Sequence, residues 1–210
     1  MKKIFLSLIE SFIRNIDGGI GLKIRYLYYK NRLGKCGKGV RIETGVFFYN
    51  PNKIYLGSNI IIDKNCIFVA GCNEKRDRTK AIEIKQKVEK GKLTIGSNSH
   101  IGINSILQAH GGIFIDEYFT CSSGCKFFSL SNDVHKCRKG IVDIGDNFPY
   151  YIEKAIYIEQ NVWFGINVTI VGGVVGNNSF IKPNSVITNE IKANSINEGF
   201  PAKFIKTRFN

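Results

Sequence analysis

The stretch Ile158–Ile170, with the sequence IEQNVWFGINVTI, decides the fold of this chain. A bulky apolar residue returns at every sixth position, at Ile158, Phe164 and Ile170, and Glu159 and Gly165 directly follow the first two. A period of six residues differs from the ~3.6-residue period of an α-helix. It is typical of a parallel β-helix, in which each inward side chain stacks on the one in the neighbouring coil.

The same register occurs elsewhere along the chain. It consists of Leu56, Ile62 and Phe68; Ile95, Ile101 and Leu107; Ile115, Cys121 and Phe127; and Val175, Ile181 and Ile187. Each coil needs inward apolar residues, a small or polar residue to round each corner, and extended residues that pair with the coils on either side. Three hexapeptides therefore close one triangular coil, and the sequence predicts an all-β parallel β-helix over residues 34–198, followed by a C-terminal tail over 199–210.

Length and composition agree with one domain of this kind. The 210 residues can bury a sizeable core, and 43% hydrophobic residues with 22 glycines are typical of a β-rich globular protein. Six cysteines, at positions 36, 66, 72, 121, 125 and 137, lie mostly at or near inward positions and lack C-x-x-C spacing. We interpret them as small buried apolar residues in a reducing compartment, and we expect no metal site.

Residues 1–33 are predicted to form a separate helical segment. Apolar side chains recur at three-to-four spacing, at Ile4, Phe5, Leu8, Ile9, Phe12, Ile13 and Ile16, which predicts an amphipathic helix over residues 1–16. Glu10 and Arg14 interrupt the apolar run too early for a transmembrane span or an ordinary signal sequence. A second basic, Tyr-rich segment follows over 20–33. We favour a helical cap on the open end of the β-helix, and the alternative is a membrane-surface segment beside anionic lipid.

The net charge of +13 suggests an anionic partner. The basic residues are spread over the N-terminal segment, residues 74–92 and the last eight residues, and they do not form one stripe interleaved with aromatic residues. Nucleic acid is therefore not an expected partner. A phosphorylated cofactor, a nucleotide- or lipid-pyrophosphate sugar, and an anionic membrane face each explain the charge more economically.

The six-residue register is lost over residues 71–92 and again over residues 128–157. The first break contains the charged run Asn73–Arg78, and the second contains Ser129–His135. Insertions expelled from a coil corner explain both breaks, and a solvated loop or hairpin is the alternative for the first. Long insertions in repeat proteins are more often functional than ordinary connections, and they can reach a neighbouring subunit.

At this point the residues carry a family resemblance. Asn161–Ile170 resembles the C-terminal coils of hexapeptide-repeat acyltransferases, and Gly199–Lys203 resembles their Gly-Asn-Pro-Ala-Lys ending. The resemblance covers roughly residues 34–208 and is strongest after Ile158. It implies a left-handed β-helix, a homotrimer with active sites between subunits, and acetyl transfer from acetyl-CoA, commonly to a sugar hydroxyl or amine. The left hand comes only from the resemblance, since the usual crossover rule predicts the opposite hand.

The chemistry of this family needs one histidine. An acceptor hydroxyl must lose its proton as it attacks a thioester, and an imidazole titrates near neutral pH. The resemblance favours His135, in the loop Asn132-Asp133-Val134-His135, as the general base, and His110 is the alternative. Asn132, Asp133 or a backbone carbonyl is expected to orient the imidazole, and the sequence does not choose among them.

Two residues are predicted to contact the acceptor, and others the cofactor. His110, which precedes Gly111-Gly112 at a corner, and Asn104 are the predicted acceptor-binding residues, whereas His100 is expected at an outward β position without a catalytic role. The predicted cofactor-binding residues in the last coils are Trp163, Gly165, Ile166, Thr188 and Lys203. Lys182-Pro183-Asn184 departs from the usual small-residue run of the family.

Three classes of function are compatible with these features. We favour an O-acetyltransferase of bacterial surface polysaccharide or lipopolysaccharide biosynthesis. We expect it in the cytoplasm, with the inner face of the membrane as the alternative location. N-acetylation of a nucleotide-linked amino sugar is the second class. The third is a metal-dependent carbonic anhydrase or a non-catalytic scaffold; the metal version needs a closely spaced histidine pair, which the three histidines of this chain do not offer.

Overall fold

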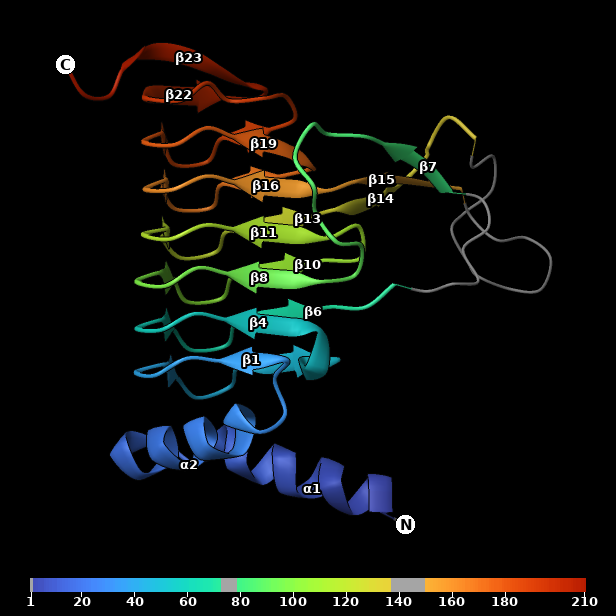
Figure 1. The fold of residues 1–210 in the computed structure, drawn as a ribbon, viewed down its shortest axis with the longest axis vertical. Helices are drawn as coiled ribbons and strands as arrows, with labels where there is room; N and C mark the ends of the chain where they lie inside the picture. The colour runs from blue at the N-terminus through green and yellow to red at the C-terminus, as the bar shows by residue number, and fades with distance from the viewer. Residues whose placement is uncertain (1, 73–78, 137–149) are drawn as a thin grey trace.

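The computed structural model describes residues 2–72, 79–136 and 150–210, and here the backbone winds as a stack of three-sided coils (Figure 1). The first face holds β1 (Lys35–Cys36), β4 (Ile54–Leu56), β8 (Leu93–Ile95), β11 (Ile113–Ile115), β16 (Ile156–Ile158) and β19 (Gly173–Val175). The second holds β2 (Arg41–Ile42), β5 (Ile61–Ile62), β9 (His100–Ile101), β12 (Thr120–Cys121), β17 (Trp163–Phe164) and β20 (Phe180–Ile181). The third holds β3 (Phe47–Tyr49), β6 (Ile67–Val69), β10 (Ile106–Gln108), β13 (Lys126–Phe128), β18 (Thr169–Ile170) and β21 (Val186–Ile187). These strands pair in parallel with their neighbours.

The coils turn in a left-handed sense. In Figure 1 the first-face strands lie nearest the viewer and run leftward, while the chain climbs from blue to red. A path that crosses the near face leftward as it rises is left-handed, so the hand implied by the resemblance is confirmed. The right-handed preference of strand crossovers does not hold for these coils.

The interior is the stack of side chains that the six-residue register predicts. Every predicted inward residue, from Leu56 to Ile187, is at most 1% exposed. Aromatic rings continue the stack from coil to coil: Phe127 lies against Phe164 with ring centroids 5.6 Å apart and planes 15° from parallel. The periodic apolar residues are therefore the core of the prism, and their removal from water stabilises it.

The corners depend on asparagines with left-handed backbone conformations. The corner between the first and second faces is formed by Asn59, Asn98, Asn161, Asn178 and Asn194. The corner between the second and third faces is formed by Asn65, Asn104, Asn167 and Asn184. Asparagine tolerates positive φ better than other side chains that carry a Cβ. Side-chain amides also connect neighbouring coils, as in the 2.7 Å bond from Asn161 Nδ2 to Asn178 Oδ1.

Replacing one of these asparagines should therefore cost stability through the backbone. We expect Asn167→Ala, at φ 57°, to lower the free energy of unfolding by about 1–2 kcal/mol. Asn167→Gly should cost much less, because glycine adopts positive φ freely. Denaturant unfolding of the two variants checks this, and equal losses for both would assign the effect to the amide hydrogen bond instead.

The two breaks in the register meet in one small structure. β7 (Thr79–Ile82) comes from the first break, and β14 (Leu130–Asn132) and β15 (Tyr151–Lys154) come from the second. β15 pairs antiparallel with β14 and parallel with β7, which makes a three-stranded side sheet beside the corner between the third and first faces (Figure 1). The charged run Asn73–Arg78 and Cys137 lie outside the described residues.

Two helices lie across the N-terminal end of the stack (Figure 1). They are α1 (Lys2–Asn15) and α2 (Gly18–Lys30), and the Asp17 carboxylate accepts a 2.9 Å hydrogen bond from the Gly18 N–H at the start of α2. Buried Tyr29 packs against Phe48 of the first coil, with ring centroids 4.7 Å apart. Buried Arg25 donates from Nε to the Ile42 carbonyl at 2.7 Å. These contacts hold α2 against the first coil, as a cap would require.

The other end of the stack is closed by strands rather than a plain tail. β22 (Ser195–Gly199) continues the second face, and β23 (Ala202–Thr207) pairs antiparallel with it. A short 3-10 helix, η1 (Pro51–Lys53), connects β3 to β4. In the described part of the chain, no helix has the length and apolar character that a membrane crossing requires.

Candidate active site

His110 lies where the side sheet joins the prism. It occupies the turn between β10 and β11, at the corner of the third and first faces, and is half-buried. Its Nδ1 lies 2.6 Å from the carbonyl oxygen of Gly71. Because a carbonyl only accepts, Nδ1 carries the proton, and the lone pair of the neutral ring is on Nε2. Gly71 therefore fixes the tautomer that makes Nε2 the basic nitrogen.

Both insertions are anchored beside this histidine. Gly71 donates to the Gly91 carbonyl at 2.6 Å, and Gly91 donates to the His110 carbonyl at 3.1 Å, so the two ends of the first insertion meet here. Gly111 donates to Ser129 Oγ at 2.9 Å, at the start of the second insertion. These hydrogen bonds hold the His110 turn against both insertions.

The glycine after His110 is required by close packing at this junction. A Cβ on Gly111 would lie 2.5 Å from the Ser129 carbonyl oxygen and 2.7 Å from Cγ of Glu153. Glu153 in turn pairs with Lys90, whose Nζ lies 2.7 Å from its carboxylate. The residues around His110 are thus packed too tightly for the turn to shift easily.

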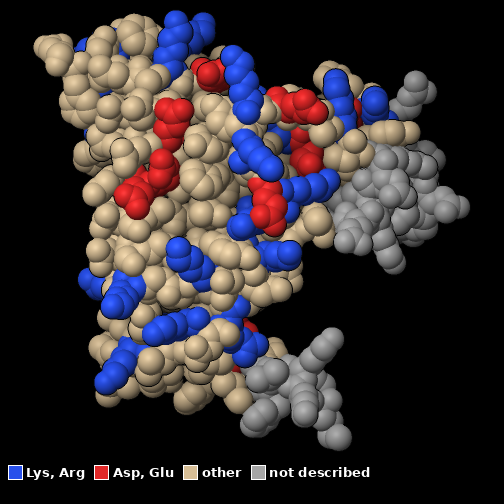
Figure 2. All heavy atoms as spheres, viewed as in Figure 1, with Lys and Arg blue, Asp and Glu red and all other residues tan. Residues whose placement is uncertain are grey.

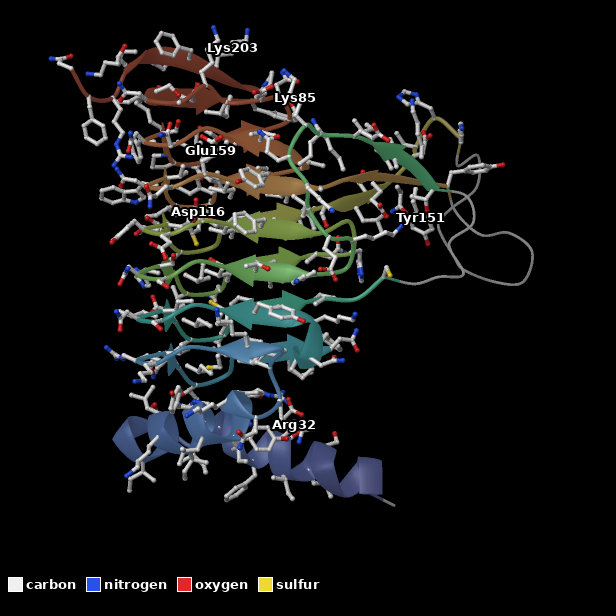
Figure 3. The ribbon with its side chains drawn as sticks, viewed as in Figure 1. Arg32, Lys85, Asp116, Tyr151, Glu159 and Lys203 are labelled. Atoms are coloured by element: carbon white, nitrogen blue, oxygen red, sulfur yellow. The ribbon has the colours of Figure 1, made fainter. Side chains whose placement is uncertain are left out.

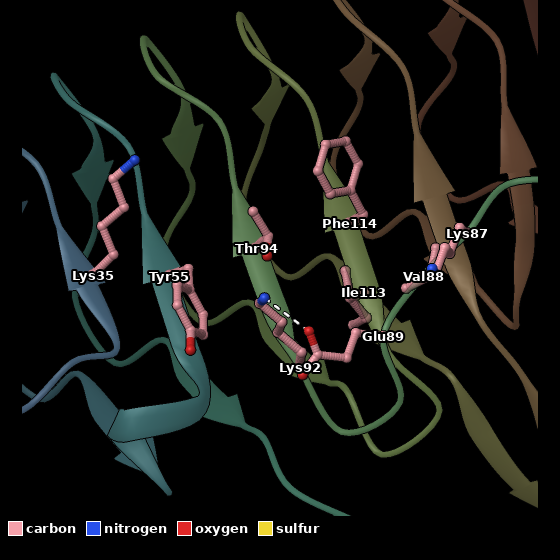
Figure 4. Close-up of a pocket in the computed structure, with 9 residues that line it drawn as sticks. All are labelled: Lys35, Tyr55, Lys87, Val88, Glu89, Lys92, Thr94, Ile113 and Phe114. Carbon is pink, nitrogen blue, oxygen red and sulfur yellow. Dashed lines mark hydrogen bonds and ion pairs between the residues drawn. The ribbon is translucent and has the colours of Figure 1, made fainter.

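A pocket opens on the first face (Figure 4), and one of its residues, Ile113, follows His110 by three positions in the chain. It has a volume of about 520 Å³ and is lined by Lys35, Tyr55, Lys87, Val88, Glu89, Lys92, Thr94, Ile113 and Phe114. Lys92 Nζ lies 2.9 Å from a Glu89 carboxylate oxygen and 4.2 Å from the centre of the Tyr55 ring. Its hydrogen bond with Glu89 raises the pKa of Lys92. The volume suits a small molecule, and the lysines suit an anionic one.

The loop that was predicted to hold the base has a different geometry. Asn132 is the last residue of β14 and pairs with Tyr151. Asp133 is buried, but its carboxylate accepts a 3.2 Å hydrogen bond from the backbone N–H of His135 rather than from the imidazole. His135 is exposed in the turn that follows. Asp133 therefore shapes the backbone of this loop, and the role of His135 stays a prediction.

The other predicted residues fall on different edges of the prism. Thr188 lies on the His110 edge, where its carbonyl accepts a hydrogen bond from Lys154 Nζ at 3.3 Å. Asn104 and Ile166 lie at the corner between the second and third faces, and Ile166 is 51% exposed. Trp163 points outward from the second face and is 47% exposed. We call the corner of Asn104 and Ile166 the Ile166 edge.

Two further predicted cofactor-binding residues, Gly165 and Lys203, lie in different parts of the stack. A Cβ on Gly165 would lie 2.7 Å from the backbone nitrogen of Pro183, so this glycine makes room for Pro183 in the next coil. Lys203 lies on β23 at the C-terminal end of the stack (Figure 3). Trp163 and Ile166 leave apolar side chains exposed on this side of the prism.

The third face separates the predicted residues at the Ile166 edge, Asn104 and Ile166, from His110. Asn104 and Ala109 bracket β10, and five residues of extended chain span roughly 15 Å at ~3.3 Å per residue. A general base, in contrast, must come within ~3 Å of the proton that it takes. A ligand held at the Ile166 edge of one chain would have to cross this face to reach His110 of the same chain.

His100 occupies the outward β position that the register predicts. Its Nε2 lies 2.8 Å from a carboxylate oxygen of Asp63 on the second face. This pair lies away from the His110 turn.

The pocket lysines are residues that the sequence pattern did not single out. The sequence feature that could have indicated them is the basic region over residues 74–92, which contains Lys87 and Lys92.

Comparison with known proteins finds similarity to bacterial acyltransferases. Residues 155–189 match the family described as "Bacterial transferase hexapeptide (six repeats)". The chain is 23% identical to a dTDP-4-amino-4,6-dideoxy-D-glucose acyltransferase of Escherichia coli, over 82% of this chain and 81% of that protein. It is 31% identical to a galactoside O-acetyltransferase of Escherichia coli K12, over 54% of this chain and 56% of that protein.

A solved structure shows the same fold over most of the chain. AntD, an N-acyltransferase from Bacillus cereus solved in complex with dTDP and 3-hydroxybutyryl-CoA, superposes with a TM-score of 0.71. The match covers 88% of each chain at 22% identity. At this identity the likeness concerns the fold.

Proposed function

We propose that this chain, whose residues 155–189 match the hexapeptide repeats of bacterial transferases, transfers an acetyl group from acetyl-CoA to a sugar that carries phosphate, with His110 as the general base. The observation that carries this proposal is the His110 imidazole, held in one tautomer at the turn that leads into β11, whose residues Ile113 and Phe114 line the lysine-containing pocket. His110 has the orienting carbonyl that the chemistry needs, so we prefer it to His135, which the resemblance alone supports.

In this proposal each group has a defined task. His110 Nε2 takes the proton from the acceptor hydroxyl or amine as that group attacks the thioester carbonyl, and the proton then passes to the departing thiolate. Gly71 keeps Nδ1 protonated throughout and stabilises the imidazolium that forms. The buried junction around Gly111 holds the ring in place while this happens.

The pocket supports a nucleotide-linked sugar as the acceptor. Lys35, Lys87 and Lys92 can pair with phosphate oxygens, and Tyr55 and Phe114 offer rings on which a base can stack. The relative that aligns over most of the chain is named for a dTDP-linked amino sugar, which favours an amine as the attacking group. The second candidate is O-acetylation of a sugar hydroxyl in surface polysaccharide or lipopolysaccharide, favoured by the 31% identity to a galactoside O-acetyltransferase.

Acetyl-CoA is the proposed acyl donor, and a neighbouring subunit is proposed to hold it. Trp163, Gly165, Ile166 and Lys203 lie away from the His110 edge of their own chain. In a homotrimer, the Ile166 edge of one chain can lie against the His110 edge of the next, which removes the need to cross the third face. The donor would supply the activated acetyl group at that junction.

An acceptor panel tests the proposed function. Purified protein is incubated with acetyl-CoA and with nucleotide-linked amino sugars, the same amino sugars without nucleotide, and neutral galactosides, and release of the CoA thiol is followed. We expect the fastest release with a nucleotide-linked amino sugar. If only the galactosides stimulate release, the hydroxyl-directed alternative holds and the phosphate-binding role of the pocket is wrong.

The pocket lysines provide a sharper prediction. We expect the double variant Lys87→Met, Lys92→Met to raise the KM for a nucleotide-linked acceptor by roughly 10–100-fold, since charge-assisted hydrogen bonds to phosphate are worth ~1.5–3 kcal/mol. The kcat should change little, because phosphate contacts far from the reacting atoms contribute mainly uniform binding. Lys192→Met, an exposed lysine in a later coil, is the matched control and should behave as wild type. An unchanged KM in the double variant would contradict the assignment of the pocket.

A further inference from the structure

The N-terminal helices bury only part of their apolar surface. The predicted apolar stripe of α1 is divided: Ile9, Ile13 and Ile16 are partly buried, whereas Leu8 and Phe12 are 65% and 75% exposed. α2 has the same division between buried residues and the exposed pair Ile20 (75%) and Leu27 (54%). Packing on the first coil therefore accounts for the buried apolar side chains of the two helices. It does not account for the apolar side chains that are exposed on their other side.

Leu8, Phe12, Ile20 and Leu27 form what we call the terminal apolar patch. Leu8 and Phe12 are four residues apart on α1 and share one side of that helix. On α2, the buried residues Gly21, Arg25 and Tyr29 recur every four residues on the side that faces the prism, which leaves Ile20 and Leu27 on the outer side. The helical layer lies at the end of the molecule, so the patch faces outward along the prism axis (Figure 1).

Positive charge lies beside this patch. Exposed Lys23 and Lys30 lie on the same outer side of α2 as Leu27, by their spacing of three to four residues. Over residues 1–43 there are ten Lys and Arg against three Asp and Glu, so this fifth of the chain carries +7 of the total +13. Figure 2 shows lysine and arginine side chains over the lower coils on this face of the molecule.

We propose that the terminal apolar patch docks on the surface of an anionic lipid bilayer. Exposed apolar side chains on short helices, with basic residues around them, have the character of interfacial helices that insert a few ångströms and pair with anionic headgroups. A second copy of this chain is a poorer occupant. It would bring two regions of net charge +7 together, and like charges oppose such an interface.

Docking in this way has a geometric consequence. The prism axis would stand along the membrane normal, because the patch faces outward along that axis. The His110 turn joins the coils of β8 and β11, so it would lie roughly 10–15 Å further from the lipid than the first coil, at ~4.8 Å between strands. The pocket would therefore open beside the bilayer without touching it.

Vesicle co-sedimentation tests the proposal. The full chain is mixed with vesicles of phosphatidylcholine, or of phosphatidylcholine with phosphatidylglycerol. We expect binding to the second kind, and a fall in binding as salt rises from about 0.1 M to about 0.5 M. The variant Phe12→Ser, Leu27→Ser should lose binding by ~10-fold or more, and Lys23→Glu, Lys30→Glu should lose a comparable amount.

A matched variant at the other end of the prism controls for non-specific binding of exposed apolar side chains to vesicles. Phe200 and Phe204 are 80% and 57% exposed, and Phe200→Ser, Phe204→Ser should bind vesicles as the wild type does. The substituted side chains are exposed, and equal unfolding midpoints will show that the fold is kept. The proposal is overturned if Phe12→Ser, Leu27→Ser sediments like the wild type. It is also overturned if that variant instead reduces the mass measured by light scattering without lipid, which would make the patch an interface between copies.

Discussion

His110→Ala should lower kcat about 10²–10⁴-fold, the usual contribution of general-base assistance. Binding of CoA should stay near the wild-type value, because the residues proposed to hold it lie on another edge. Turnover with a saturating acceptor is measured beside CoA affinity from calorimetry. His100→Ala is the control, since its imidazole pairs with Asp63 away from the His110 turn, and it should keep near-native turnover.

A second substitution separates catalysis from structure at the same position. In His110→Asn, the side-chain amide can still donate to the Gly71 carbonyl, but it cannot take a proton near neutral pH. We expect this variant to keep the wild-type unfolding midpoint and to lose as much turnover as the alanine variant. If His110→Asn stays active while His135→Ala loses 10²–10⁴-fold, the base is His135, as the family resemblance suggests.

Mixed assemblies should recover activity that neither parent shows. Light scattering should first give three times the 23.6 kDa of one chain. Ile166→Glu places a charge where the donor is proposed to lie, and His110→Ala removes the base, so each homotrimer should be nearly inactive. When equal amounts are unfolded and refolded together, a site needs the intact His110 from one variant and the intact Ile166 from the other. Random assembly then restores about a quarter of wild-type activity if neighbouring subunits share each site.

The control for this experiment uses both substitutions in one chain. A chain with His110→Ala and Ile166→Glu, refolded with an equal amount of wild type, should leave the same quarter of sites intact. If the two single variants give no activity together while this control does, each site is built from one chain. In that case the bound donor would have to extend across the third face, from the Ile166 edge to His110 of the same chain.

The core of this fold was predictable because one rule governs it. Residues such as Ile158 and Phe164 must stack inward in every coil, so their spacing alone indicates their burial. The N-terminal helix was predictable in the same way, from its apolar spacing. The division of that apolar stripe was not, because it depends on how α1 lies on the first coil. The outward Leu8 and the partly buried Ile9 are equally apolar in the sequence.

The corner position of His110 was predictable, whereas its contacts were not, and the sequence favoured His135 as the base. Sequence reasoning placed His110 at a corner, yet the carbonyl that fixes its tautomer belongs to Gly71, 39 residues earlier in the chain. The side sheet joins strands from two separate insertions, and no periodicity indicates such a pairing. Lys87 and Lys92 become part of a pocket only because the first insertion returns across the first face.

The most direct test of the central claim is mass spectrometry of the acceptor after incubation with acetyl-CoA and the protein. We predict that a nucleotide-linked amino sugar gains the mass of one acetyl group, that fragmentation places this group on the sugar rather than on the nucleotide, and that His110→Ala forms the product far more slowly. Acetylation that proceeds at the wild-type rate in His110→Ala, or the absence of any acetylated product across nucleotide sugars, amino sugars and galactosides, would contradict the account.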